Sequence, residues 1–87
     1  MRKDRAIVLN PNGMHLRMAS RVVKTKKHFD VDVVIAKGDE RADGDSILQL
    51  LSLNAQQGCE IEISVDGDRA DEALKALREL FSDGGGI

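Results

Sequence analysis

One stretch organises the rest of the chain: Asn10-Pro11-Asn12-Gly13-Met14-His15-Leu16-Arg17-Met18-Ala19. Its first four residues favour turns, and a helical pattern begins directly after His15. An imidazole there lies where a helix exposes unpaired backbone N–H groups and the positive end of its dipole, which suits a phosphate. Arg17 adds a permanent cation able to grip phosphate oxygens. Because a neutral imidazole nitrogen is nucleophilic, the stretch predicts a phosphoryl-accepting histidine, although a plain surface histidine also fits these local features.

The composition is typical of one small soluble domain. The chain has 87 residues, 41% hydrophobic and 32% charged, which argues against disorder. A net charge of −2 and only two aromatic residues argue against a basic, base-stacking nucleic-acid surface. The single cysteine, Cys59, allows neither an internal disulfide nor a cysteine metal cage, so we expect a reducing cytoplasm, no metal and no cofactor. We also expect no signal peptide and no membrane span. Residues 1–83 are predicted to form the domain, and 84–87 a flexible Gly-rich tail.

Alternating and helical spacings follow one another in the order β-α-β-β-α-β-α. Strands are predicted at 6–9, 31–35, 41–43 and 60–66, and helices at 16–28, directly after Ser46, and at 70–81. The 60–66 segment alternates most regularly, and the 70–81 segment has the clearest helical period. Because the strands alternate, one sheet face is apolar and the other polar. We therefore predict an α+β fold: an open-faced β-sandwich with a four-stranded, mostly antiparallel sheet and three helices on one face.

The short helix after Ser46 carries more apolar residues than one narrow stripe holds: Ile47, Leu48, Leu50, Leu51 and Leu53. One interpretation is that some of them are exposed and form a partner surface. The other is a helix buried on two sides. The sequence fits both equally.

Two motifs match one known family in residues and in spacing. Asn12-Gly13-Met14-His15-Leu16-Arg17-Met18-Ala19 matches its phosphorylation loop, and Gly44-Asp45-Ser46-Ile47-Leu48 matches its regulatory serine segment. Gly58 and Gly67 fit its later turns. From about Arg5 to Phe81, the chain resembles the HPr family, the histidine-containing phosphocarrier proteins of the bacterial phosphotransferase system.

The resemblance implies a role for each matched residue. His15 would take a phosphoryl group on its Nδ1 from phosphoenolpyruvate by way of enzyme I, and pass it to a sugar-specific EIIA-type acceptor. Arg17 would steady the phosphate, and Ser46 would be the site of HPr kinase/phosphorylase. The implied partner-binding residues are Leu16, Ser20, Ile47, Leu48 and Leu51, with the basic residues Lys24 and Lys27. Such a protein is a phosphoryl carrier rather than a turnover enzyme, and we expect a monomer.

Two positions depart from the family pattern. Met18 stands where the family usually has proline. Because methionine does not fix φ as proline does, we expect a less rigid His15 loop, at a free-energy cost of about 0.5–1 kcal/mol. Asp45 stands where a lysine often precedes the serine. With Asp43 nearby, the Ser46 segment is acidic, so a phosphate added there would meet like charges.

Two questions stay open from the sequence. Ser46 fits a plain helix N-cap as well as a regulatory site. The chain as a whole fits a phosphocarrier, which His15 and Arg17 favour. It also fits a regulatory binding module that uses Ser46 and the apolar patch to bind a transcription factor or another target, for which Met18 and Asp45 leave room.

Overall fold

The computed structural model describes residues 1–82, so the predicted tail at 84–87 lies outside the described part. The elements are β1 (Arg2–Ile7), α1 (Leu16–Phe29), β2 (Asp32–Lys37), β3 (Glu40–Asp43), α2 (Ile47–Ser52), β4 (Glu60–Asp66) and α3 (Ala70–Ser82). The predicted order of elements is therefore confirmed.

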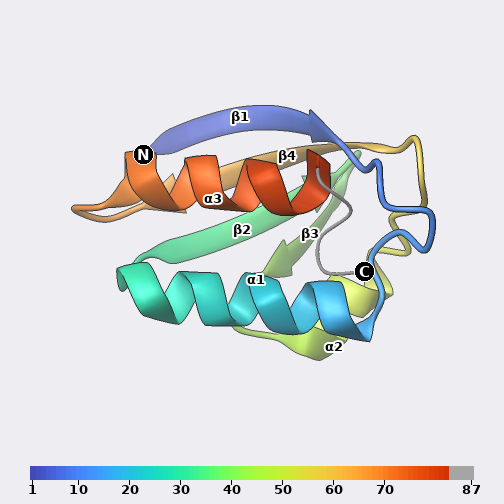
Figure 1. Ribbon diagram of the computed structural model, residues 1–87, viewed down its shortest axis with the longest axis horizontal. Helices are drawn as coiled ribbons and strands as arrows, with labels where there is room; N and C mark the ends of the chain where they lie inside the picture. Colours follow the sequence, from blue (N-terminus) through green and yellow to red (C-terminus); the bar gives the residue numbers. More distant parts are fainter. Residues whose placement is uncertain (83–87) are drawn as a thin grey trace.

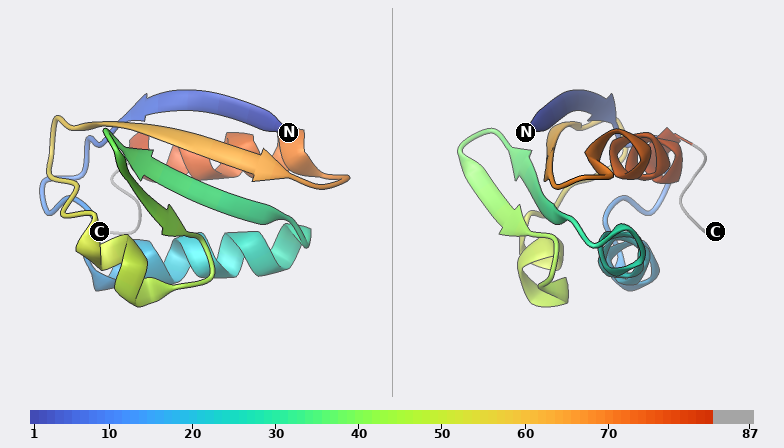
Figure 2. Two further views of the ribbon diagram at one scale, coloured as in Figure 1. Left: turned by 180° about the vertical axis from the view of Figure 1, so that it is seen from behind. Right: turned by 90° about the vertical axis from the view of Figure 1, so that its left-hand side faces the viewer.

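Within the described residues, the strands form one antiparallel sheet in the order β1-β4-β2-β3. All three helices lie on the same face of this sheet, with α1 and α3 across it and α2 beside α1 (Figures 1 and 2). The predicted open-faced α+β architecture is confirmed. No helix of the described part is long and apolar enough to cross a membrane.

The period-2 pattern of the central strands decides which face the helices cover. Ile61, Ile63 and Val65 of β4 are buried, and so are Val33 and Ile35 of β2. The register pairs Val33 with Val65 and Ile35 with Ile63, so these side chains share one face and form the floor of the core.

The first strand begins earlier than the sequence predicts. The structure places β1 at Arg2–Ile7 rather than at 6–9, because its backbone pairs with β4 along the whole of that range. Its charged residues are tolerated because the strand lies at the edge of the sheet, where they reach the surface. Asp4, for example, pairs with Arg78 of α3 at 3.0 Å. Val8 follows the strand and is fully buried.

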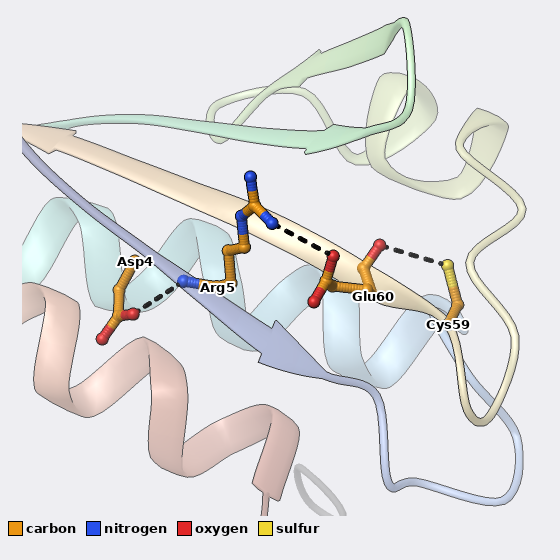
Figure 3. Close-up of polar contacts among 4 residues, drawn as sticks. All are labelled: Asp4, Arg5, Cys59 and Glu60. Carbon is orange, nitrogen blue, oxygen red and sulfur yellow. Dashed lines mark hydrogen bonds and ion pairs between the residues drawn. The ribbon is translucent and has the colours of Figure 1, made fainter.

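The opposite face of the sheet has polar contacts of its own near the β1–β4 edge (Figure 3). Arg5 reaches across to Glu60 with 3.7 Å between Nη1 and Oε1, and both side chains are exposed. The Cys59 thiol donates to the Glu60 carbonyl at 3.5 Å. An exposed pair of this kind adds about 0–1 kcal/mol, so the Arg5–Glu60 pair contributes little to stability.

The two long helices, α1 and α3, cover the apolar face of the sheet and complete the core. α1 buries Met18, Ala19 and Val22 and ends at Phe29, and its C-cap residue Asp30 takes the left-handed conformation with φ 54°. α3 buries Ala73, Leu77 and Phe81 among others. The start of α1 is therefore tied to the core directly behind His15.

Candidate functional site

His15 is the N-cap residue of α1. Its backbone is extended, with φ −102° and ψ 176°, and its carbonyl accepts the first helical hydrogen bond from Ala19 N–H at 2.9 Å. The side chain makes no capping hydrogen bond, and the first turn of α1 contains no acidic residue. The N–H groups of a first helical turn have no acceptor inside the helix, so this end keeps a positive potential beside the partly exposed imidazole.

The imidazole is held by the loop that precedes it. Asn10 is fully buried, and its Nδ2 lies 2.9 Å from Nε2 of His15. The Oδ1 atom of Asn10 accepts the Asn12 N–H at 3.0 Å, and its carbonyl accepts the Gly13 N–H at 2.9 Å. The turn between Asn10 and His15 is thus closed by hydrogen bonds from both ends.

Gly13 fixes this loop against a distant part of the chain. Its φ is +62°, and a Cβ atom there would lie 2.3 Å from the carbonyl oxygen of Ala55. The same oxygen accepts the Met14 N–H at 2.7 Å. Only glycine allows so close an approach, so the loop's position depends on the segment that follows α2.

The first helix carries the other predicted residues on its surface. Arg17 lies in the first turn and is exposed, and Leu16 keeps 61% of its surface accessible. Ser20, Lys24 and Lys27 follow Leu16 at helical spacing, and both lysines are exposed. Leu16, Ser20, Lys24 and Lys27 therefore form one stripe along α1 that starts beside His15, and Arg17 lies next to its start.

The short helix α2 resolves the choice between an exposed patch and burial on two sides. Leu50 and Leu53 are buried, whereas Leu48 keeps 79% of its surface accessible, and Ile47 and Leu51 are half-buried. The helix α2 that carries them packs against α1 and lies close to the start of α1 (Figure 2). We call Leu16, Ile47, Leu48 and Leu51 the apolar surface.

Ser46 is the N-cap residue of α2. Its Oγ accepts the Gln49 N–H at 3.2 Å, the bond expected of a capping serine. Asp45 pairs with Lys26 of α1 at 3.1 Å, and the Lys26 side chain is only 16% exposed. The acidic character of this segment is therefore partly compensated by a lysine that the sequence did not connect with it.

Met18, which stands where the family usually has proline, fills part of the core. It is the third residue of α1, and its side chain is fully buried in the core. A proline fits the backbone of a first helical turn, but its smaller ring would fill less of the core than the Met18 side chain does. Whether the missing proline makes the loop less rigid stays a prediction.

The sequence analysis missed two parts of the site. Asn10 was treated only as a turn former, although it contacts the ring of His15. The support from Ala55 was not anticipated at all. An asparagine in a turn often accepts the backbone N–H two residues further on, so the bond from the Asn12 N–H to Asn10 has a recognisable local signal, whereas nothing local indicates the contact with His15.

Comparisons with known proteins agree with this geometry. The family described as PTS HPr component phosphorylation site matches residues 3–83. Phosphocarrier protein HPr of Neisseria meningitidis serogroup A is 34% identical over 82 residues, covering 94% of this chain and 92% of that protein. Phosphocarrier protein NPr of Escherichia coli K12 is 33% identical over 84 residues, covering 94% and 92%. The crystal structure of HPr-C-His from Thermoanaerobacter tengcongensis has a TM-score of 0.91 at 30% identity, covering 100% of this chain and 98% of that one.

Proposed function

This chain belongs to the HPr family of phosphotransferase-system phosphocarrier proteins, and from that premise we propose that His15 is its phosphoryl acceptor. The phosphoryl group comes from phosphorylated enzyme I and goes to an EIIA-type acceptor of the phosphoenolpyruvate-dependent sugar system. The observation that carries the proposal is the imidazole at the N-cap of α1, which takes no part in capping the helix. The protein acts as a carrier between two partners rather than as a turnover enzyme.

The chemistry of the site suits this exchange. A ring nitrogen of His15 forms a bond to phosphorus as the donor's bond to phosphorus breaks. The positive end of α1 and the guanidinium of Arg17 stabilise the negative charge on the phosphoryl oxygens. Positioning and electrostatic stabilisation of this kind supply most of the catalysis in phosphoryl transfer, so partner docking completes the site.

The apolar surface, with Ser20, Lys24 and Lys27, is where we place the partners. Leu16 and Leu48 supply apolar area at the centre, and the lysines at its rim steer acidic partners towards His15. Phosphorylation of Ser46 by HPr kinase/phosphorylase adds negative charge beside this surface and weakens docking. The protein works as a monomer in the cytoplasm, and it needs no metal or cofactor of its own.

One assay tests the assignment. The purified protein is incubated with phosphoenolpyruvate and enzyme I, and we expect one acid-labile phosphoryl group in the native protein and none in His15→Ala. His28→Ala is the matched control, since His28 lies at the other end of α1 and should leave labelling unchanged. Labelling of His15→Ala to the wild-type level would place the acceptor elsewhere.

The exposed side chain of Leu48 also supports a second candidate, a regulatory binding module that docks a transcription factor or another target through α2. Such a module binds its target through Leu48 without any phosphoryl transfer. Failure of enzyme I to label the native protein would favour this candidate over the carrier.

A further inference from the structure

The chain before His15 runs beside the segment that joins α2 to β4 (Figures 1 and 2). Within this segment, the Ala55 carbonyl accepts the Met14 N–H at 2.7 Å, and its oxygen is the atom nearest to where a Cβ of Gly13 would lie. Ala55 is buried, so water does not readily replace this bond. The direction of the Ala55 carbonyl therefore fixes the backbone just before the imidazole.

The two residues before Ala55 need support from outside α2. Asn54 takes the left-handed conformation with φ 52°, which is unfavourable for residues other than glycine, although asparagine tolerates it better than most. Leu53 is the C-cap of α2, where the last carbonyls of a helix have no partner inside it. The last turn of α2 contains no basic residue that could bind them. A group from another element must therefore stabilise this end of the helix.

Lys37, the last residue of β2, supplies that support. It follows the buried Ile35 at the period of two, so its side chain lies on the face of the sheet that the helices cover. Its Nζ donates to the Leu53 carbonyl at 2.9 Å and to the Asn54 carbonyl at 3.2 Å. A charged donor makes stronger hydrogen bonds than a neutral one, and a cation also stabilises the negative end of a helix. One ammonium group thus holds the two consecutive peptide groups directly before Ala55.

We propose that Lys37 is a positioning residue for His15. Its ammonium fixes the two peptide groups before Ala55, and the Ala55 carbonyl then holds the Met14 N–H, so that the imidazole stays in place for phosphoryl transfer. The effect on transfer rests on the proposed function, whereas the support of the loop does not. Because Lys37 binds carbonyl groups, it acts through the backbone of two loops rather than on the reacting atoms.

The competing role for a half-buried lysine is to steer an acidic partner, as proposed for Lys24 and Lys27. The two roles differ in what the loss of the charge changes. Loss of steering raises the concentration of this protein that half-saturates transfer, and does so more at low salt. Loss of positioning lowers the maximal transfer rate and leaves docking unchanged.

Two variants and two controls separate these roles. Lys37→Met removes the charge and both hydrogen bonds while keeping much of the side-chain length. Lys37→Arg keeps a cation with several donors, so it should restore most of what Lys37→Met loses. Ser46→Ala loosens α2 at its other end and controls for a general loss of helix stability. Lys75→Met removes the same charge from an exposed position on α3.

The first measurement needs no partner protein. Amide hydrogen exchange, followed by ¹H–¹⁵N NMR, compares the Met14 N–H with the Leu9 N–H, whose acceptor is the Phe81 carbonyl of α3 at 3.1 Å. In Lys37→Met, exchange at Met14 should become about 3- to 10-fold faster relative to Leu9, and the ratio should stay at the parental value in both controls. An unchanged ratio in Lys37→Met, or the same change in Ser46→Ala, would overturn the proposal.

The second measurement follows single-turnover transfer from phosphorylated enzyme I to His15. Lys37→Met should lower the maximal rate about 3- to 10-fold and leave the half-saturating concentration within about 2-fold of the parent, whereas Lys75→Met should match the parent in both. A salt-dependent rise in the half-saturating concentration at an unchanged maximal rate would overturn the positioning role and make Lys37 a steering charge. If the exchange result holds while enzyme I fails to label the parent protein, Lys37 supports the loop and the carrier function fails.

Discussion

His15 and Ser46 occupy the same structural position, the N-cap of a helix, and their side chains are used in different ways. The Oγ atom of Ser46 is bound to the first turn of its own helix, at Gln49 N–H. The His15 ring is instead hydrogen-bonded to Asn10, five residues earlier in the chain, and leaves the first turn of α1 without a side-chain cap. A capping side chain stabilises its helix, whereas an uncapped helix start keeps its N–H groups for an anion.

The two sites also differ in what supports them. The His15 loop is fixed by a tight approach to Ala55. The Ser46 segment is held by side-chain contacts near the surface, including the pair between Asp45 and Lys26. We therefore expect the His15 region to be rigid and intolerant of substitution, and the Ser46 region to be adjustable. The following predictions test this difference, in order of decreasing effect.

The largest effect is expected for Gly13→Ala. The new Cβ atom would lie 2.3 Å from the Ala55 carbonyl oxygen at a φ of +62°, so the loop must move. We expect a loss of more than about 3 kcal/mol in the free energy of unfolding, together with slower phosphorylation of His15. Gly38→Ala is the control, because Gly38 has φ +59° with nothing within 4 Å. Denaturant unfolding should show a loss of about 1–2 kcal/mol there, with labelling of His15 unchanged. Equal losses in the two variants would mean that the contact with Ala55 does not matter.

Leu48→Ser should affect binding and leave stability almost unchanged, because 79% of this side chain is exposed. We expect weaker binding of enzyme I by about 1.5–3 kcal/mol if the partner buries the side chain completely, at low and at high salt alike. Calorimetric titration measures the affinity. Ile7→Ser, on the other face of the sheet, is the matched control and should bind as the parent does. Parental affinity in Leu48→Ser would move the interface away from α2.

Ser46 gives an intermediate effect with two separable parts. Ser46→Ala loses the hydrogen bond to Gln49 N–H and should lower the free energy of unfolding by about 1 kcal/mol. Ser46→Asp keeps a capping oxygen and adds a charge, so it should stay folded while His15 is phosphorylated more slowly. Asp43 and Asp45 reduce the contrast, since part of the repulsion exists already, although Lys26 compensates Asp45. Transfer rates are measured with enzyme I, and circular dichroism follows folding. A folded Ser46→Asp protein that transfers as fast as the parent would leave Ser46 as a helix cap only.

Lys24→Glu and Lys27→Glu should give the smallest effect, about 1 kcal/mol or less each in enzyme I affinity. These exposed charges act mainly on the encounter rate, so the loss should be larger at low salt than at high salt. Association rates measured across a salt series test this. Lys75→Glu on α3 makes the same charge change elsewhere on an exposed position and should have less effect. A loss that is independent of salt would indicate direct contacts rather than steering.

Much of the fold was predictable because its signals are local. The alternation at Glu60–Asp66 predicts β4 with its observed bounds, and the period from Ala70 predicts α3 to within one residue. β1 was placed too late, because its charged residues give no apolar alternation, and its extended form depends on pairing with β4.

The sequence by itself determined where the reactive histidine lies. A turn followed by a helical period puts His15 at a helix start, since both patterns depend on residues close along the chain. The tertiary structure decided what that position can do. The bond from Asn10 and the close approach of Gly13 to Ala55 join segments that no local pattern relates, and the same is true of the exposure of Leu48. Contacts of this kind depend on how the whole chain packs, so only the folded molecule sets the hydrogen bonding of the His15 ring and the surface around it.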